Sequence, residues 1–374
     1  GFGLPLAGHK DNHSGIMNNN QFNDYKKLMQ IREGQEWSKT EGIDLNISEL
    51  NLIVKSNPLS KCNREFSEII PIMSLKEIAF NKIISTQEAF GKIMNEIGKV
   101  KNSFTNRIIT TSPDVTVSTS LGGWVNKKNI FSTHKKTDVF GEKKVFSSQK
   151  WKYLPDGQHI ELGIAENNLF LLLASLGISD KLFGKRILPV GTIYDTFIGR
   201  GLDALNYATY IDSRFILVGT PSGVTLSHEG GAHQSILTPN IGISQPNLAY
   251  FEPSYADELE FLFFWGLEYM QKKEGSSIYF RLSTKKLMQP ERKLSQKNKQ
   301  DIVKGCYWLY KPETSQPIIV ISTGVMIGEV EKLKEEITKE EIDIGVLIVT
   351  SPDTLYSNWI NSIDNNISSH IEKT

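Results

Sequence analysis

Short apolar, β-rich runs alternate with helical patterns between residues 158 and 288. The strand-like runs are RILPVGTIY, FILVGT, NLAYFEPS and SIYFRLS, and the helical patterns among them are ENNLFLLLASLGIS, DTFIGRGLDALNYATYI and YADELEFLFFWGLEYMQKK. Short strands that alternate with helices are typical of βαβ units. The pattern therefore predicts an α/β fold with a mostly parallel sheet.

The flanking segments extend this prediction. STQEAFGKIMNEIGKVKN starts with the N-cap candidate Ser85 and carries Glu88 three residues later, which predicts a capped helix. RIITTSPDVTVSTS predicts a strand, a loop and, in its last residues, a candidate strand. Beyond residue 290, PIIVISTG, VEKLKEEITKEE and IGVLIV form a strand–helix–strand unit, too small for an independent α/β domain. We therefore expect a truncated second domain.

These patterns divide the chain into four parts. Residues 1–45 are polar, with one helical piece, QFNDYKKLMQIREG, and residues 46–84 have the irregular composition of a linker. Residues 85–290 form the main α/β domain, and residues 291–374 form the truncated one. Both chain ends look cut, because the sequence opens at GFGL without an initiator Met and stops at HIEKT.

Composition excludes several classes of protein. Hydrophobic residues make up 39% of the 374 residues, and Lys+Arg and Asp+Glu both number 42, as in a soluble globular protein with no nucleic-acid partner. The longest apolar run, Leu169–Ala174, is too short to span a bilayer. Cys62 and Cys306 lie far apart and suggest neither a disulfide framework nor a zinc site. With no signal-peptide pattern, we expect a cytoplasmic protein.

Glu166 lies at the start of a segment that must be buried, ENNLFLLLASLGIS. Desolvation disfavours the charged form of a carboxylate. Two interpretations remain open from the residue alone. Glu166 is an ordinary acid in the first turn of a helix, favoured by the helix dipole, or it is held there for chemistry.

The segment YDTFIGRGLDA places Tyr194, Phe197 and Arg200 at intervals of three residues. On a helix these side chains share one face. An aromatic face with a cation beside it could bind a flat heterocycle and an anion. The alternative is core aromatic residues beside a solvated arginine.

The segment LSHEGGAHQS carries His228, Glu229 and His233 around paired glycines, in a loop that follows the strand FILVGT. Ligands bind at the carboxyl ends of parallel strands, and imidazoles suit proton transfer near neutral pH. This density of polar groups favours a functional loop over a plain surface loop. The spacing matches no standard metal motif, and the chain has neither a P-loop nor a G-x-G-x-x-G fingerprint.

Together these segments resemble the thiamine-diphosphate-dependent transketolase superfamily, over nearly the whole chain. GIAENN resembles its G-I-x-E segment, SPDVTVST its S-x-D-L-T-x-S segment, IYDTFIGRGLDA its aromatic helix start and HEGGAHQS its acid-G-x-x-H-Q loop. The resemblance implies a pyrimidine-binding domain at 85–290 and a partial transketolase-like carboxyl-terminal domain at 291–374. Residues 1–45, with AGHKDNHSG, resemble the tail of the preceding diphosphate-binding domain.

The resemblance also implies roles for individual residues. Glu166 would hydrogen-bond a ring nitrogen of the cofactor's aminopyrimidine, and Phe197, with Tyr194 beside it, would stack on that ring. Asp114 and Ser118 would lie against the cofactor and the substrate.

Other residues would act on the substrate. Glu229 and His233, with His228, would be active-site groups that handle protons. His13 would match a substrate-contacting histidine, and Arg200 resembles an anion-binding arginine of deoxyxylulose-phosphate synthases.

Two departures narrow the substrate class within the superfamily. Transketolases carry a His where this chain has Pro221 and an Arg where it has Thr284, and both family residues bind the sugar phosphate. GTPSG followed by His228 and Glu229 is closer to the homodimeric pyruvate dehydrogenase first component. That likeness implies decarboxylation of a 2-oxo acid, pyruvate, with transfer of the acyl group to a lipoyl carrier on an acyltransferase partner.

One family feature is missing from the sequence. The family anchors magnesium and the diphosphate through a G-D-G…N segment in its first domain, and this chain has none. We predict that the chain alone binds the cofactor poorly and turns over negligibly. The resemblance implies a homodimer, because in the family this half of the site faces the diphosphate-binding domain of the other subunit. The alternatives are transketolase-type ketol transfer between sugar phosphates, and a regulatory or structural paralogue without catalysis.

Overall fold

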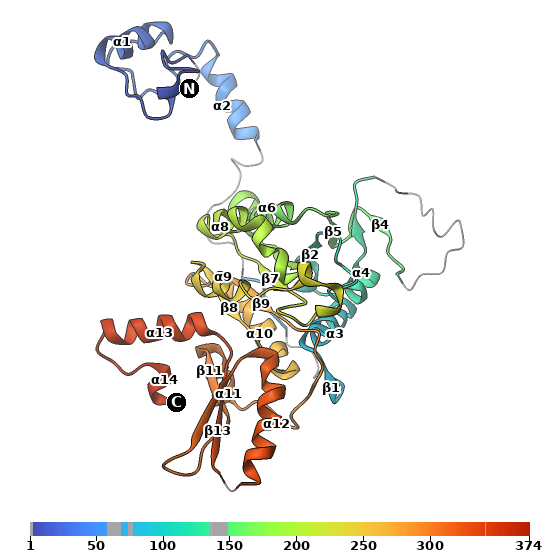
Figure 1. Ribbon diagram of the computed structural model, residues 1–374. Coiled ribbons are helices and arrows are strands. Elements are labelled where there is room, and N and C mark those ends of the chain that lie inside the picture. Colours follow the sequence, from blue (N-terminus) through green and yellow to red (C-terminus); the bar gives the residue numbers. More distant parts are fainter. Residues whose placement is uncertain (1–2, 58–68, 74–77, 135, 137–148, 341) are drawn as a thin grey trace. The chain divides into compact units, whose positions relative to one another are not determined.

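The computed structural model describes residues 3–57, 69–73, 78–134, 136, 149–340 and 342–374 (Figure 1). The chain divides into two compact units, Gly1–Cys62 and Asn63–Thr374. The search for membrane spans, limited to the described residues, finds no helix with the length and apolar character needed to cross a bilayer.

The described residues of the first unit form short helices. They are η1 (Lys10–Asn12), α1 (Asn19–Leu28) and α2 (Ile47–Ser56). Asn18 begins α1 with a reciprocal side-chain capping arrangement with Gln21, so the predicted helical piece is present. Helix α2 lies where the composition predicted an irregular linker. Its start is fixed by the Asn46 side chain, which accepts a hydrogen bond from the backbone N–H of Ser48.

The second unit contains a parallel sheet that, within the described residues, has eight strands. In spatial order they are β4 (Tyr153–Leu154), β3 (Ile130–Phe131), β5 (His159–Glu161), β2 (Ile108–Ser112), β6 (Leu188–Ile193), β7 (Ile216–Gly219), β9 (Ser277–Arg281) and β8 (Leu248–Phe251). All the pairings are parallel, so the carboxyl ends of the strands meet at one edge. The predicted α/β fold with a parallel sheet is confirmed.

Helices cover both faces of this sheet (Figure 1). The helices of this region are α3 (Thr86–Lys99), α4 (Gly122–Lys128), α6 (Glu166–Gly177), α7 (Ser179–Phe183), α8 (Leu202–Tyr210), α9 (Thr238–Ser244) and α10 (Ala256–Tyr269). Helix α3 starts at the predicted cap, where Ser85 and Glu88 form a capping box. Helices α3 and α10 pack on one face and α6 and α8 on the other.

Side chains of successive strand residues alternate between two cores. In β7, Ile216 and Val218 belong to the core under α3 and α10, whereas Leu217 belongs to the core under α6 and α8. Both faces of a parallel sheet are buried in this way, which explains why FILVGT reads as a continuous apolar run.

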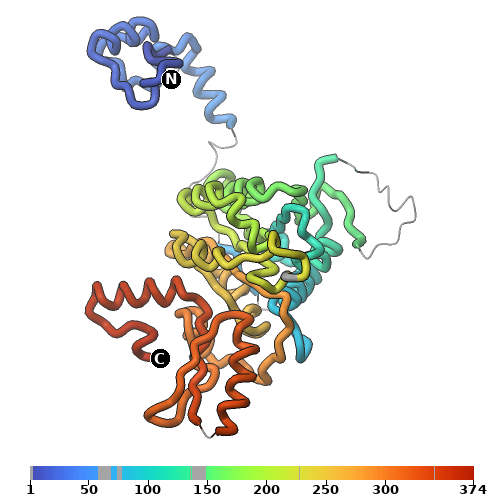
Figure 2. The backbone as a smooth tube through the Cα atoms, in the orientation of Figure 1, coloured from blue at the N-terminus to red at the C-terminus, as the bar shows by residue number. Residues whose placement is uncertain are grey.

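The carboxyl-terminal part, orange to red in Figure 2, contains within its described residues a three-stranded sheet. Its order within the described residues is β11 (Cys306–Tyr310), β13 (Ile344–Val349) and β12 (Ile318–Ser322), with β11 antiparallel to β13. Helices α11 (Gln296–Lys304), α12 (Ile327–Thr338), α13 (Pro352–Asp364) and α14 (His370–Lys373) accompany it. Ile302, Tyr307 and Val346 belong to the same core as Phe280, so this sheet shares the compact unit of the larger one. A small antiparallel pair joins β1 (Ile83–Ile84) to β10 (Leu287–Met288).

One predicted element is absent. The β-branched residues of VTVSTS suggested a strand, but residues 115–121 form turns that lead into α4. The Thr119 hydroxyl donates to the Val115 carbonyl at 2.7 Å, and the preceding Asp114 has a φ of 63°. Such local side-chain-to-backbone hydrogen bonds favour turns over strand pairing.

Candidate functional site

Glu166 is the first residue of α6, which is anchored by Leu169, Phe170 and Leu173 in the core against β6. The residue is 9% exposed. Its carboxylate therefore sits at the rim of an apolar helix, as the sequence indicated. The helix dipole favours a negative charge at this end, but the contact that the carboxylate makes comes from elsewhere in the chain.

Tyr194, Phe197 and Arg200 share one face, as their spacing predicted. They follow β6, with Tyr194 as the N-cap of the 3₁₀ helix η4 (Asp195–Gly201) and the other two residues inside it, and a 3₁₀ helix superposes residues three apart. The rings of Tyr194 and Phe197 stack with centroids 5.9 Å apart, at an interplanar angle of 25°. The Arg200 guanidinium carbon lies 3.7 Å from the centroid of Phe197.

Arg200 joins this aromatic face to Glu166. Its Nη1 donates a hydrogen bond to Oε1 of Glu166 at 2.5 Å, while its side chain remains 53% exposed. A flat cation thus lies on Phe197 and donates an N–H to Glu166. The same two contacts would suit a flat, nitrogen-containing ring.

His233 adds a third ring to the cluster. It lies in η6 (Gly231–His233), with its centroid 5.8 Å from Tyr194 and 5.6 Å from Phe197. Its Nδ1 is buried and, among the described residues, has no hydrogen-bond partner. A buried nitrogen without a partner calls for a ligand or a water.

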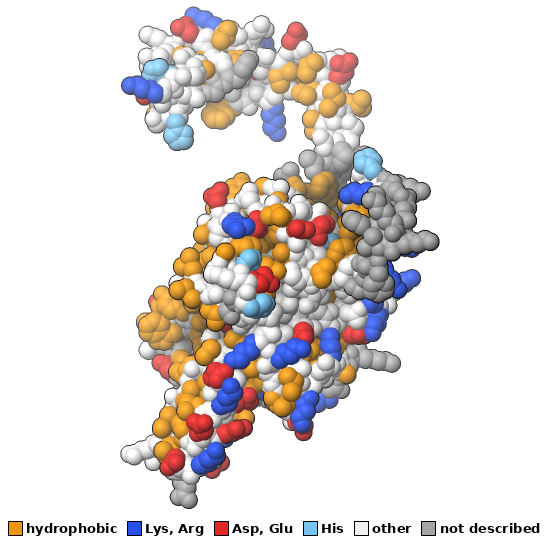
Figure 3. Space-filling view, turned by 45° about the vertical axis from the view of Figure 1, so that its right-hand side comes forward, with side chains coloured by type: hydrophobic (Ala, Val, Ile, Leu, Met, Phe, Trp, Pro, Cys, Tyr) orange, Lys and Arg blue, Asp and Glu red, His pale blue; other side chains and the backbone are white. Residues whose placement is uncertain are grey.

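The other groups of the HEGGAHQS loop are less constrained. His233 Nε2 lies 4.0 Å from Oε2 of Glu229, which belongs to η5 (Ser227–Glu229). His228 is exposed on the same short helix, and the described residues give it no hydrogen bond or ring contact with the cluster. Figure 3 shows histidine and acidic side chains together on one face of the surface.

Asp114 and Ser118 lie in the loop after β2, at the carboxyl edge of the sheet. Neither makes a direct hydrogen bond to the Glu166 cluster in the described part of the chain. Instead, Glu161 Oε1 accepts from the Asp114 backbone N–H at 2.8 Å, and Glu161 Oε2 accepts from the Thr116 hydroxyl at 2.6 Å. The buried His159 lies between the hydroxyls of Thr110 and Thr116, at 2.8 and 3.0 Å.

This Glu161–His159 network was not predicted from the sequence. Burial raises the pKa of Glu161, but the hydrogen bonds from His159, Thr116 and the Asp114 backbone outweigh it, and the pKa is lowered. The available signal was His-x-Glu at the end of a strand, two residues before GIAENN.

A second unpredicted group lies under η4. Arg281, at the end of β9, contacts Asp195 Oδ2 through Nε at 3.2 Å and Glu252 Oε1 through Nη1 at 2.8 Å. The Tyr279 hydroxyl also hydrogen-bonds Asp195. These buried contacts hold η4 on the sheet and so position Phe197. An arginine at the end of the apolar run SIYFR was the signal for it.

His13 follows η1 in the first compact unit, where it is exposed. Its predicted contact with substrate therefore stays a prediction. Among the described residues, no group of three or more His, Cys, Asp or Glu side chains is placed to hold a metal ion.

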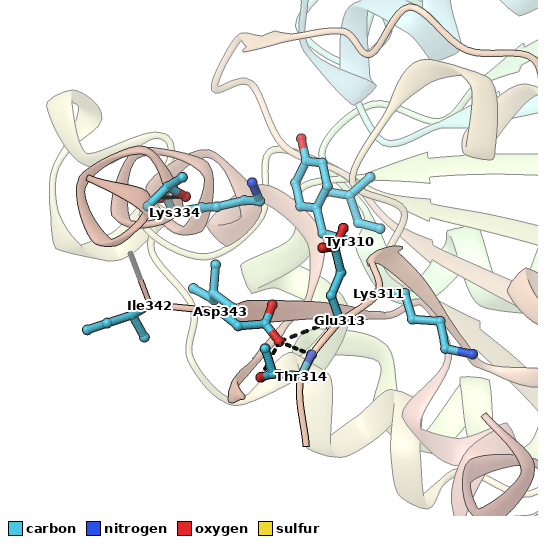
Figure 4. A pocket seen from close by; sticks show the side chains of 10 residues that line it. Tyr310, Lys311, Glu313, Thr314, Lys334, Ile342 and Asp343 are labelled. Carbon is cyan, nitrogen blue, oxygen red and sulfur yellow. Dashed lines mark hydrogen bonds between the residues drawn. The ribbon is translucent and has the colours of Figure 1, made fainter. Parts of the chain in front are cut away.

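Figure 4 shows a surface cavity of about 540 Å³ between Tyr310, Lys334 and Asp343. Asp343 accepts hydrogen bonds there from Thr314 and from the Glu313 backbone, which lower its pKa. The carboxylate therefore holds a turn, and none of the predicted site residues lines this cavity.

Comparisons with known proteins identify relatives of this chain. The family described as pyruvate dehydrogenase E1 component middle domain matches residues 74–288, more than half of the chain. A 1-deoxy-D-xylulose-5-phosphate synthase of Clostridium tetani is 23% identical over 203 residues, which are 54% of this chain and 30% of that protein. A pyruvate dehydrogenase E1 component of Pseudomonas aeruginosa is 25% identical over 295 residues, 75% of this chain and 32% of that protein.

Solved structures give the same fold. Transketolase from Leishmania mexicana superposes with a TM-score of 0.58 at 15% identity, covering 92% of this chain and 43% of that one. The fold of this chain is therefore of the transketolase type. The chain belongs to the pyruvate dehydrogenase E1 component middle domain family. It spans about a third of the length of the curated relatives named above and 43% of the transketolase.

Proposed function

We propose that this chain forms the pyrimidine-binding part of an enzyme that decarboxylates a 2-oxo acid, pyruvate, and transfers the acyl group to a lipoyl carrier. The observation that carries the proposal is the Arg200 guanidinium, which lies on Phe197 and donates to Glu166. These are the contacts that the aminopyrimidine of thiamine diphosphate requires. The donor set therefore fits that end of the cofactor, and His233 Nδ1 beside it has no hydrogen-bond partner among the described residues.

The chemistry that thiamine diphosphate supplies is carbanion stabilisation at a carbonyl carbon. In our proposal Phe197, backed by Tyr194, holds the ring by stacking. Glu166 holds a proton at the ring nitrogen, and the buried rim of α6 excludes water from that hydrogen bond. Asp114 and Ser118 would bound the site on the side of β2, where Glu161 fixes the backbone of Asp114.

Arg200 cannot make its present contacts while a ring occupies them. Its half-exposed side chain would turn away and offer a charge-assisted hydrogen bond to the carboxylate of the 2-oxo acid. His233, with His228 and Glu229 on the same loop, would then move protons to and from the substrate oxygen. The resemblance assigns His13 a contact with the substrate.

The choice of a 2-oxo acid over a sugar phosphate rests on two positions. Pro221 and Thr284 replace the phosphate-binding His and Arg of transketolases. The pyruvate dehydrogenase relative also aligns over 75% of this chain, against 54% for the deoxyxylulose-phosphate synthase. We further propose that the protein is a cytoplasmic homodimer in which a diphosphate-binding domain holds Mg²⁺ and the diphosphate. The acceptor of the acyl group would be a lipoyl acyltransferase.

The test is an assay of the protein purified in the assembly in which it occurs, with thiamine diphosphate and Mg²⁺. Pyruvate with an artificial electron acceptor should react, and a ketose phosphate with an aldose phosphate should not. Turnover of the sugar phosphates alone would replace this proposal with ketol transfer. Activity with neither pair, together with no thiamine binding, would point to a non-catalytic paralogue.

A further inference from the structure

Another cavity, of about 650 Å³, lies where the carboxyl ends of strands from both sheets meet. Glu252 follows β8 and Arg281 ends β9, while Ser322 ends β12 and Val349 ends β13. Ligands of α/β proteins bind outside the carboxyl ends of strands and between packed layers. None of the residues that line the cavity belongs to the Glu166–Phe197–His233 cluster.

Its walls are apolar and open to solvent. Val224, Ile236, Ile243, Ile321 and Met326 all line it, and each is at least 42% exposed. Single exposed apolar side chains are ordinary on a protein surface, but several around one hollow mark a binding site. The walls are formed by loops and by the first residues of helices that follow strands of both sheets.

The floor offers hydrogen-bond donors without partners. Nε and Nη1 of Arg281 are bonded to Asp195, Thr238 and Glu252, whereas Nη2 has no hydrogen bond to the described residues. Gly223 leaves room beside it, because a Cβ there would come within 3.1 Å of Nη2. The Ser322 Oγ is buried, and within the described residues it too lacks a partner. Such groups are costly to bury unpaired.

Charge decides the class of ligand. The charged residues among those that line the cavity are Glu252 and Arg281, which form an ion pair at 2.8 Å. Asp195 lies behind them on the same guanidinium. An anion entering the cavity would face two carboxylates, and a cation would face the guanidinium. The two carboxylates and one guanidinium sum to one negative charge, which disfavours an anion. A cation would approach the Arg281 guanidinium, and both carboxylates already accept hydrogen bonds from it, so a cation would regain little of the hydration that it loses.

We propose that this cavity binds an uncharged, largely apolar molecule that carries hydrogen-bond acceptors for Arg281 Nη2 and the Ser322 hydroxyl. The ligand differs in class from thiamine diphosphate and from a 2-oxo acid, which are both anions. The inference does not depend on the proposed function, because the cavity and the cluster share no residue.

Three probes with one skeleton test the charge rule: 4-phenylbutan-2-one, 3-phenylpropanoate and 3-phenylpropylammonium. The reporter is the ε-methyl group of Met326 in protein labelled with ¹³C-methyl methionine, assigned with Met326→Leu. The ketone should shift this signal saturably, and each ion should bind at least about tenfold more weakly. Ser322→Ala should weaken the ketone about fivefold, since it removes one hydrogen bond.

Matched tryptophan variants test the location. Ile321 lines the cavity and is 63% exposed, whereas Ile319, on the same strand, is 44% exposed and does not line it. Ile321→Trp should abolish binding of the ketone, and Ile319→Trp should leave it unchanged. The proposal is overturned if the Met326 signal does not move, if all three probes bind equally (an adventitious additive only), or if Ile321→Trp binds like the unchanged protein.

Discussion

Glu166 and Glu258 occupy the same position in their helices but differ in the side chains that surround them. Each lies in the first turn of a helix packed on the parallel sheet, α6 for Glu166 and α10 for Glu258. Each also pairs with an arginine, Arg200 and Arg292. The helix dipole favours an acid in both places, so local sequence does not distinguish them.

Their partners do. Glu258 is fully buried and accepts from the Ser254 backbone at 2.8 Å, from Arg292 at 3.0 Å and from the Tyr307 hydroxyl. Burial raises the pKa of its carboxyl, and Arg292 opposes this. Glu166 has one side-chain partner among the described residues, and that partner is half exposed.

This difference distinguishes an acid that stabilises the fold from an acid that can exchange its hydrogen-bond partner. The Glu258 carboxylate ties α10 to β11, and removing any partner leaves a buried charge behind. The Glu166 carboxylate can exchange its guanidinium for another flat donor at little cost, because an ion pair with a half-exposed partner contributes little to stability.

The largest effect should come from Glu258→Ala. It removes a buried acceptor shared by Arg292, the Tyr307 hydroxyl and the Ser254 N–H, and should lower the free energy of unfolding by about 3–5 kcal/mol. Urea denaturation followed by tryptophan fluorescence measures this, with Glu166→Ala as the matched control, expected to lose no more than about 1 kcal/mol. Equal losses in the two variants would erase the distinction between the acids.

Substitution of the two partner arginines should show the same difference in stability. Arg292 also binds Asp257 at 2.7 and 3.1 Å, so Arg292→Met should cost about 3 kcal/mol or more. Arg200→Met should change stability by no more than about 1 kcal/mol, because the side chain is half exposed. A strongly destabilised Arg200→Met would mean that this pair, too, is structural.

Glu161 allows the comparison to be tested by the pH dependence of stability. It lies close in sequence to Glu166, but several hydrogen bonds hold its carboxylate. Its pKa is lowered, so its contribution to stability is present above about pH 4.3, the ordinary value for Glu, and is lost as pH falls through the folded-state value. Glu161→Gln should be less stable than the unchanged protein by about 1–2 kcal/mol at neutral pH. Urea midpoints should converge below about pH 4; a gap that does not narrow would contradict this.

The smallest effect concerns competition for Phe197. Arg200→Met removes the guanidinium that occupies the contacts with Phe197 and Glu166 proposed for the pyrimidine ring. The variant should therefore bind thiamine about fivefold more tightly. Isothermal titration calorimetry measures it, with Arg200→Lys as control, because a lysine keeps the charge without the flat fork. Weaker binding in Arg200→Met would instead make the guanidinium part of the ring's binding site.

Local features of this fold could be predicted from sequence. The cap at Ser85, the parallel α/β sheet and the shared face of Tyr194, Phe197 and Arg200 follow from short-range patterns. The antiparallel strand β11 and the turns after Asp114 were missed, because strand pairing and side-chain-to-backbone bonds overrode the pattern.

The assembly of the candidate site could not be predicted in the same way. The hydrogen bond from Arg200 to Glu166 and the contact of His233 with Phe197 join residues more than thirty positions apart. Such contacts depend on how α6, η4 and the loop after β7 pack. The resemblance to a known family named some of these residues, but it gave no sign of the Arg281–Asp195–Glu252 cluster beneath them.

The most direct test is the affinity of this chain for thiamine, which carries the pyrimidine ring without the diphosphate. Calorimetry would compare the unchanged chain with Glu166→Ala, whose folding should be nearly intact. We predict that thiamine binds at least about tenfold more weakly to Glu166→Ala, since a charge-assisted hydrogen bond to the ring is lost. Equal affinity in the two proteins would remove Glu166 from the site.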